Sequence, residues 1–210
     1  MSSFRRRQML AAAVSGGGGY IVFADPEVEA ICATTFGDGI GTTIEDVSGS
    51  IPESIAKELF ANNSTIRTFD EFEYFTCFGH ISSDSPWNPS TYGLFWNCTN
   101  LQSIKLPPNI PSLGNYMFRG TALTRIDIPD SVTEVKDQSF GATINLSLVF
   151  RGSVPPSFMQ TSFWGSQNLI VYCPYSSDHS VLAAYQTALS GVVSYSALIE
   201  LNPDGTIPNS

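Results

Sequence analysis

Residue types that carry much protein chemistry are scarce in this chain of 210 residues. It contains two histidines, four cysteines, and ten lysines and arginines against nineteen aspartates and glutamates, which give a net charge of −9. No apolar run approaches the roughly 18 residues that a membrane-spanning helix needs. The cysteines lie far apart and form no CxxC pair, so the spacing of a metal site is absent. We expect all four to be buried free thiols.

The same scarcity argues against catalysis and against nucleic-acid binding. His80 and His179 belong to no nucleophile, zinc or phosphate-binding motif, and we expect both to be solvated loop residues. The sequence therefore predicts no catalytic residue, no metal site and no cofactor. After the basic start, seven basic residues face nineteen acidic ones, and such an acidic body would repel phosphate backbones.

One motif recurs five times in the middle of the chain. Each copy has a phenylalanine, a short polar loop and an apolar, strand-like run, and the phenylalanines lie 35, 23, 22 and 23 residues apart. The five are Phe60, Phe95, Phe118, Phe140 and Phe163. The pattern predicts a solenoid in which every unit adds one short strand, because a single unit cannot bury its apolar face alone. The long first interval indicates an insertion at about residues 75–94.

Two further columns of residues are in register with the phenylalanines. The third position after each one is small or polar, namely Asn63, Cys98, Thr121, Thr143 and Ser166. We expect this column to turn the backbone inside the stack, which makes Cys98 a structural residue. After the strand, two units carry apolar residues at matching offsets, Ile110 and Leu113 in one and Val132 and Val135 in the next.

Two copies state the motif in full, Leu101-Gln-Ser-Ile-Lys-Leu-Pro107 and Leu123-Thr-Arg-Ile-Asp-Ile-Pro129, each with apolar return positions and a following phenylalanine. This pattern resembles the BspA-type leucine-rich repeat over roughly residues 60–174. The resemblance implies an α+β solenoid with a helical N-terminal cap and a C-terminal capping helix.

The chain accordingly divides into four predicted parts. These are a basic, glycine-rich arm over 1–19, a helical N-terminal cap over 20–59, the leucine-rich repeat solenoid over 60–174, and a C-terminal cap and tail over 175–210. Asp25-Pro26-Glu27 predicts the start of a helix that ends at Gly37. Shorter helices are expected over 44–47 and 52–59, and a final helix near Asp178, with Val181, Leu182, Tyr185 and Leu189 on one face.

Two surfaces are candidate binding sites. The positions between the apolar strand residues point outward, and Gln102, Lys105, Arg125 and Asp127 occupy them, beside Ser103 and Thr124. Mixed polar groups suit contact with a glycan or a protein, or they only keep the sheet soluble. In the insertion, Trp87 and Tyr92 are candidates to stack on sugar rings or to anchor a protein interface. The alternative is that this loop only covers the open edge between the first units. The acidic residues Asp70, Glu71 and Glu73 are expected to be a solvated edge.

The first residues suggest an anchor. Arg5, Arg6 and Arg7, with Met9 and Leu10, precede a glycine run and indicate an arm that docks into a large assembly, the alternative being a solvated disordered tail. An Arg-, Ala- and Gly-rich start that runs into Phe-Ala-Asp-Pro-x-Val-Glu, here Phe23 to Glu29, resembles the N-terminal region of proteins from tailed phages of gut bacteria.

That resemblance implies a non-enzymatic virion accessory protein, a head- or tail-attached decoration or fibre component whose arm binds capsid, portal or tail proteins. Its repeat body would face a host-surface glycan or protein or another virion protein, and a homo-oligomer within the particle is left open. The alternative is an exported bacterial surface adhesin, from which residues 1–19 would be removed as an atypical signal.

Overall fold

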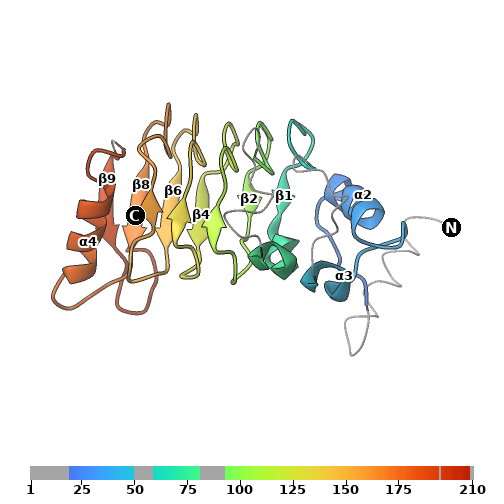
Figure 1. Cartoon of the computed structure of the whole chain (residues 1–210), viewed down its shortest axis with the longest axis horizontal. Helices are drawn as coiled ribbons and strands as arrows, with labels where there is room; N and C mark the ends of the chain where they lie inside the picture. Colours follow the sequence, from blue (N-terminus) through green and yellow to red (C-terminus); the bar gives the residue numbers. More distant parts are fainter. Residues whose placement is uncertain (1–18, 50–58, 81–92, 194, 209–210) are drawn as a thin grey trace.

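The repeats build a stack of short parallel strands. The computed structural model describes residues 19–49, 59–80, 93–193 and 195–208, and Figure 1 shows the strands side by side along one axis. Successive coils contribute β1 (Thr68–Phe69), β2 (Ser103–Ile104), β4 (Arg125–Ile128), β6 (Ser147–Phe150) and β8 (Ile170–Cys173). β1 pairs with β2, while β4, β6 and β8 pair in order, and every pairing is parallel. The predicted solenoid-like stack of strands is confirmed.

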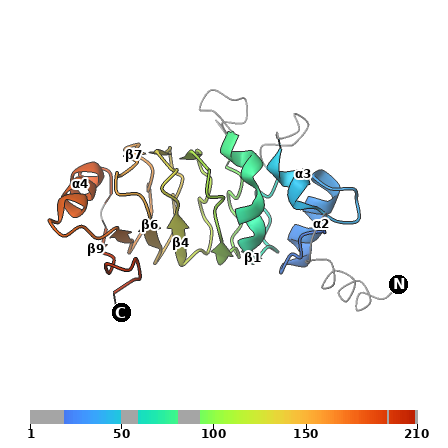
Figure 2. The same cartoon turned by 90° about the horizontal axis from the view of Figure 1, so that it is seen from below.

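A second row of strands lies on the return side of the coils (Figure 2). It consists of β3 (Ser112–Leu113), β5 (Glu134–Val135) and β7 (Ser157–Phe158), again paired in parallel. Leu113 is the register partner of Val135, and both are fully buried. The apolar return positions read from the sequence are therefore the inward positions of this second sheet, and the core lies between the two rows.

A phenylalanine ladder runs through the core. Its five rings belong to Phe60, Phe95, Phe118, Phe140 and Phe163, and successive ring centroids are 5.4, 5.6, 5.6 and 5.8 Å apart. The planes of neighbouring rings differ by only 15°, 4°, 17° and 8°. Such stacking arises because each ring holds the same position in its coil, and every coil buries its ring against the next.

The turn after each ladder residue requires an unusual backbone conformation. The second residue after the phenylalanine has a positive φ in all five coils: 59° in Asn62, 58° in Asn97, 71° in Gly120, 55° in Ala142 and 78° in Gly165. Glycine and asparagine adopt this left-handed region more readily than other residues. The repeated turn thus explains why small and amide residues follow the phenylalanines.

Side chains of the small or polar column donate hydrogen bonds to backbone carbonyl groups at that turn. The hydroxyls of Thr121 and Thr143 donate to the carbonyl oxygens of Phe118 and Phe140 at 2.9 and 2.8 Å. The Cys98 thiol instead contacts the carbonyl oxygen of Phe60, in the preceding coil, at 2.9 Å. Cys98 is therefore structural, because it occupies a buried polar position of the repeat.

The cysteines are buried free thiols, which confirms the prediction. All four, Cys32, Cys77, Cys98 and Cys173, are unpaired and buried. Burial raises the pKa of Cys77, Cys98 and Cys173 to about 11. Burial, and then the nearby carboxylate of Glu71, raise the pKa of Cys32 as well. The thiols consequently stay protonated at neutral pH, which makes them poor nucleophiles.

The N-terminal segment packs on the first coil through two helices. α2 (Pro26–Thr35) confirms the helix predicted from Asp25-Pro26-Glu27, and α3 (Ile44–Ser48) confirms the shorter one. Val28 and Cys32 of α2 are fully buried. The helix expected over 52–59 lies outside the described residues, apart from its last position.

The start of the predicted insertion is part of the core. After β1, the chain forms the 3₁₀ helices η1 (Asp70–Tyr74) and η2 (Thr76–His80). Phe75 and Phe78, within the predicted insertion, are 0% and 5% exposed, and their rings contact that of Phe36, which follows α2. These aromatic residues hold the N-terminal segment against the repeats.

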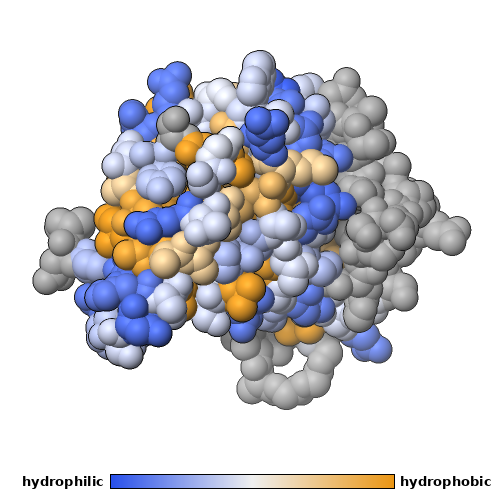
Figure 3. All heavy atoms as spheres, turned by 60° about the vertical axis from the view of Figure 1, so that its left-hand side comes forward, coloured by the Kyte–Doolittle hydropathy of each residue, from blue (hydrophilic) through white to orange (hydrophobic). Residues whose placement is uncertain are grey.

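The sheet continues beyond residue 174, where the sequence predicts its end. α4 (Ser180–Leu189) begins two residues after Asp178, whose carboxylate accepts from the Ser180 amide at 3.1 Å. β9 (Ala197–Glu200) then pairs in parallel with β8 as a further strand. Tyr185 and Leu189 of α4 are fully buried, while Val181 and Leu182 are partly buried, as the predicted apolar face requires. Figure 3 shows this end with apolar and polar residues interspersed on its surface.

The segment after β9, residues 201–208, lies on the outer face of the sheet. Figure 2 shows it on the side of the strands that is away from β7. Leu201 is buried with Val149 and Tyr172 in a small apolar cluster, and Ile207 packs against it. This C-terminal tail covers the outer face of β6 and β8. No helix in the described ranges is long and apolar enough to cross a membrane.

Candidate functional site

A shallow hollow of about 590 Å³ lies on the outer face of the sheet, over β2 and β4. The structure brings together here the four outward residues singled out from the sequence, Gln102, Lys105, Arg125 and Asp127. The other polar residues that line the hollow are Asp70, Ser103, Thr124 and Arg151. We call this surface the polar hollow.

Strand alternation places these side chains. In β4, Ile126 and Ile128 are each 1% exposed, whereas Arg125 is exposed and Asp127 half-buried. Successive residues of a strand point to opposite faces of a sheet, so burying the two isoleucines turns Arg125 and Asp127 outward. In β2, the same alternation buries Ile104 and turns Ser103 outward.

At the C-terminal side of the polar hollow, two arginines donate hydrogen bonds to the same carboxylate, that of Asp127. Arg125 donates from Nε to Asp127 Oδ1 at 3.0 Å and from Nη2 at 2.9 Å. Arg151, from the next coil, donates from Nη2 to Asp127 Oδ2 at 2.5 Å and from Nη1 to the carbonyl oxygen of Gly205 at 2.7 Å. Arg151 therefore connects the polar hollow to the C-terminal tail.

The helix η1 bounds the opposite side. The Ser103 hydroxyl donates to Asp70 Oδ1 at 2.5 Å, and Lys105 Nζ donates to Glu73 Oε1 at 3.3 Å. The hydrogen bond with Glu73 raises the pKa of Lys105, and the negative charge of Glu73 adds to the effect. Glu71, in turn, accepts from the Ala24 amide at 2.9 Å. These acidic residues are partly exposed at the edge of the first repeat, and each also bonds to a second segment of the chain.

The polar hollow offers both donors and acceptors in a fixed arrangement. Its cations lie beside carboxylates, so the surface is locally balanced although the chain as a whole is acidic. The side chains of Arg125 and Asp127 are 50% and 43% exposed, which leaves both hydrated and within reach of a ligand. Such a surface suits a polar partner. Within the described parts of the chain, no cluster of His, Cys, Asp or Glu could hold a metal ion.

Sequence reasoning missed Asp70 and Arg151 as part of this surface. Phe150 is the register partner of Ile128, so Arg151 holds the position of Pro129 one coil earlier. Aligning the coils residue by residue would have placed Arg151 beside β4. Asp70 could not have been placed by such an alignment, because it belongs to η1, which does not follow the repeat.

The other predicted site residues do not join the polar hollow in the described structure. Trp87 and Tyr92, and the arm residues Arg5, Arg6, Arg7, Met9 and Leu10, lie outside the described residues. His179 is exposed, as predicted, and its Nδ1 lies 2.5 Å from Glu200 Oε2. The side chain of His80 lies outside what the structure describes.

The stacked parallel strands, the phenylalanine ladder and the polar outer face define a leucine-rich repeat solenoid. The chain belongs to the BspA type leucine rich repeat family: the family model, which comprises six copies, matches residues 48–147 and 91–169, together more than half of the chain. No curated protein and no solved structure matched the chain. Membership in this repeat family suggests a protein-binding or adhesion role.

Proposed function

We propose that this chain is a non-enzymatic binding protein that holds a macromolecular partner, a protein or a surface glycan, at the polar hollow. The observation that carries the proposal is the convergence of Gln102, Lys105, Arg125 and Asp127 on one surface hollow. Repeat solenoids use such extended faces for binding, and this one is rigid because the coils beneath it are fully packed.

Charge placement supports the same role. Arg151 is held by both Asp127 and the Gly205 carbonyl, so its guanidinium is already ordered before a partner arrives. Ordered arginines lose little freedom on binding and are common among the residues that dominate interface energy. Exposed ion pairs contribute little to stability, so these side chains can be changed without unfolding the protein.

Arg125→Ala is expected to weaken partner binding by about tenfold while leaving the fold intact. The measurement is photo-cross-linking in the native source material, with a benzophenone amino acid replacing the exposed Thr124 at the polar hollow. The probe should capture a partner, and adding Arg125→Ala should cut the yield. The control places the same probe at the exposed Thr133, on the return side beside β5. Equal capture from both positions, or a yield insensitive to Arg125→Ala, would refute the role of the polar hollow.

For the biological setting we propose a virion component of a tailed phage, attached to head or tail by its arm, with the repeats facing outward. The resemblance of Phe23–Glu29 and of the preceding Arg- and Gly-rich start to phage proteins supports this setting. The Asp25-Pro26 pair in that segment begins α2, which packs on the first coil. An arm that precedes α2 would thus be joined directly to the repeat body.

Changing Arg5, Arg6 and Arg7 together to Glu is expected to abolish incorporation into phage particles, because the reversed charge would repel the surface that the arm binds. The measurement is copy number in purified particles, with Asp130→Ala, an exposed change in the repeat body, as control. Peptide mapping of the particles should also recover residues 1–19. A normal copy number of the Glu variant contradicts the anchor, and cleavage near Ser15 supports the exported adhesin instead.

A further inference from the structure

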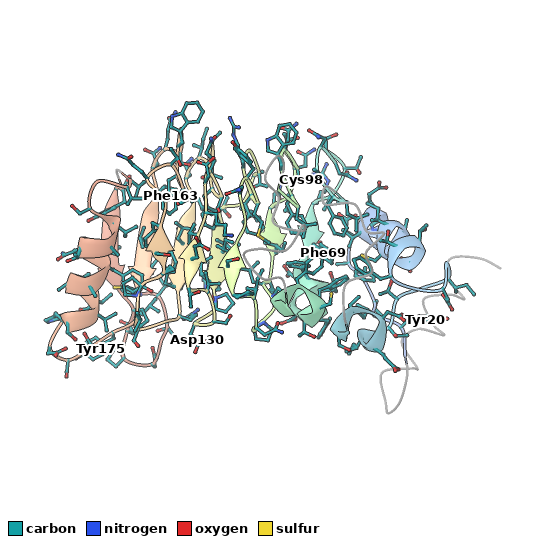
Figure 4. The ribbon with its side chains drawn as sticks, in the orientation of Figure 1. Tyr20, Phe69, Cys98, Asp130, Phe163 and Tyr175 are labelled. Carbon is teal, nitrogen blue, oxygen red and sulfur yellow. The ribbon has the colours of Figure 1, made fainter. Side chains whose placement is uncertain are left out.

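A second surface lies on the loop edge of the coils, at the position directly after each ladder phenylalanine. Backbone bonds fix its register: the Gly120 amide donates to the Gly141 carbonyl oxygen at 3.0 Å, and the Ala142 amide donates to the Trp164 carbonyl oxygen at 3.0 Å. Arg119, Gly141 and Trp164 therefore occupy equivalent places in three consecutive coils. This is the edge that carries Cys98 and Phe163 in Figure 4.

Gly141 has no side chain, so the side chains of Arg119 and Trp164, in the coils before and after it, can contact each other. The guanidinium carbon of Arg119 lies 5.7 Å from the centre of the Trp164 ring, although the two residues are two coils apart. It also lies 5.6 Å from the centre of the Tyr116 ring. A Cβ at Gly141 would come within 3.2 Å of the Trp164 carbonyl oxygen and 3.1 Å of the Gln138 Cβ, so a larger residue would crowd the column.

The Trp164 ring is both exposed and held. It is 60% exposed, which leaves the indole accessible to a ligand. The Arg119 guanidinium is attracted to the π-face of the Trp164 ring, and this contact limits the motion of the ring. An exposed aromatic ring held in one place is pre-organised for stacking, because little side-chain entropy remains to be lost on binding.

Exposed amide side chains follow Trp164 in the same turn. Between Phe163 and β8 the exposed Gln167 and Asn168 follow Trp164, and the Asn168 side chain donates to Asn145 Oδ1 at 2.9 Å. Of the large apolar residues described on this edge, only Trp164 and Ile144 are exposed. A typical protein interface covers about 800 Å² per partner around an apolar core, which two separate residues do not supply.

We propose that Trp164, Arg119 and Tyr116 form a glycan-binding ridge that takes neutral pyranose rings. One face of such a ring presents C–H groups that stack on the indole. The sugar hydroxyls can accept hydrogen bonds from a guanidinium and can both donate to and accept from side-chain amides. The net charge of −9 disfavours a polyanion at the same place. The ridge is separate from the polar hollow, none of whose lining residues it shares.

The test titrates the full chain with neutral hexasaccharides of glucose, mannose and N-acetylglucosamine. Isothermal titration calorimetry measures the affinity of the unchanged protein and of each variant, and NMR follows the indole Nε1–H resonance of Trp164 in the proteins that retain it. At least one hexasaccharide should shift this resonance. Trp164→Ala should weaken its binding by about tenfold, the loss expected for one stacking ring. Arg119→Lys, which keeps the charge but loses the planar group, should weaken it less.

Tyr175→Ala is the matched control, since Tyr175 is an aromatic residue that is 44% exposed outside the ridge. It should bind as the unchanged protein does. The proposal is overturned if none of the hexasaccharides shifts the Trp164 resonance, if Trp164→Ala binds as well as the unchanged protein, or if an oligothymidine shifts the resonance and competes with the sugar.

Discussion

Phe118→Ala is expected to lower the free energy of unfolding by about 3–5 kcal/mol, the range for removing a buried ring. Phe118 is fully buried in the middle of the ladder, with Phe95 and Phe140 each 5.6 Å away. In a solenoid, stability is a sum over coils and over the interfaces between neighbouring coils. The substitution leaves a cavity that touches two such interfaces, and urea denaturation followed by circular dichroism measures the loss.

The matched comparison is Phe163→Ala at the C-terminal end of the ladder. Phe163 is 4% exposed and has one ladder neighbour, Phe140, together with Phe158 from the return side. Its loss should be smaller than that of Phe118, because only one ladder interface is broken. Equal losses at the two positions would show that the ladder contacts are not what couples the coils.

Asp25→Ala is expected to cost about 2–4 kcal/mol, an unusual loss for a single carboxylate outside the repeats. Asp25 is 7% exposed, and its Oδ1 accepts from the Glu27 amide at 3.0 Å, which caps the start of α2. Its Oδ2 accepts from the amides of Arg67 at 2.7 Å and Thr68 at 3.4 Å, at the start of β1. Alanine would remove the helix cap and leave these partly buried amides without their acceptor.

Asp46→Ala provides the control, since Asp46 also belongs to a helix start. Asp46 is exposed and accepts from the amide and hydroxyl of Thr43, in the capping box of α3, but reaches no repeat. Its loss should stay near 1 kcal/mol in the same urea experiment. If Asp25→Ala cost no more than Asp46→Ala, the bonds to β1 would contribute nothing to stability. Asp25→Asn, which keeps one acceptor oxygen, should fall between the two.

These expectations bear on binding as well as stability. The polar hollow depends on β2 and β4 keeping their register, and the coils that carry them are joined through Phe95 and Phe118. η1, which supplies Asp70, follows directly on the β1 residues that Asp25 holds. The polar hollow is therefore ordered from beneath by the ladder and from one end by the N-terminal segment.

The sequence by itself determined the coils and much of what faces outward. Equivalent phenylalanines recur at 22 to 23 residues in the regular part, so each coil meets the same environment as its neighbour, and an inward or outward position in one coil holds in the next. That is why Arg125 and Asp127 could be assigned to the outer face, and Thr121 and Thr143 to the buried turn. The start of α2 could also be predicted from the sequence, because Asp25-Pro26 is a pair typical of the N-cap and first position of a helix.

Only the tertiary structure decided where the non-repeating segments lie. The Asp70–Ser103 and Arg151–Gly205 contacts join residues 33 and 54 positions apart, one from a 3₁₀ helix and one from the tail, and neither follows the period. The pairing of β9 with β8, and the contact of Arg119 with Trp164 across Gly141, are likewise tertiary. In the repeats, the period determines which residues of adjacent coils lie side by side. A segment outside the repeats has no such period, so its position is determined only by its contacts with the surface that it covers.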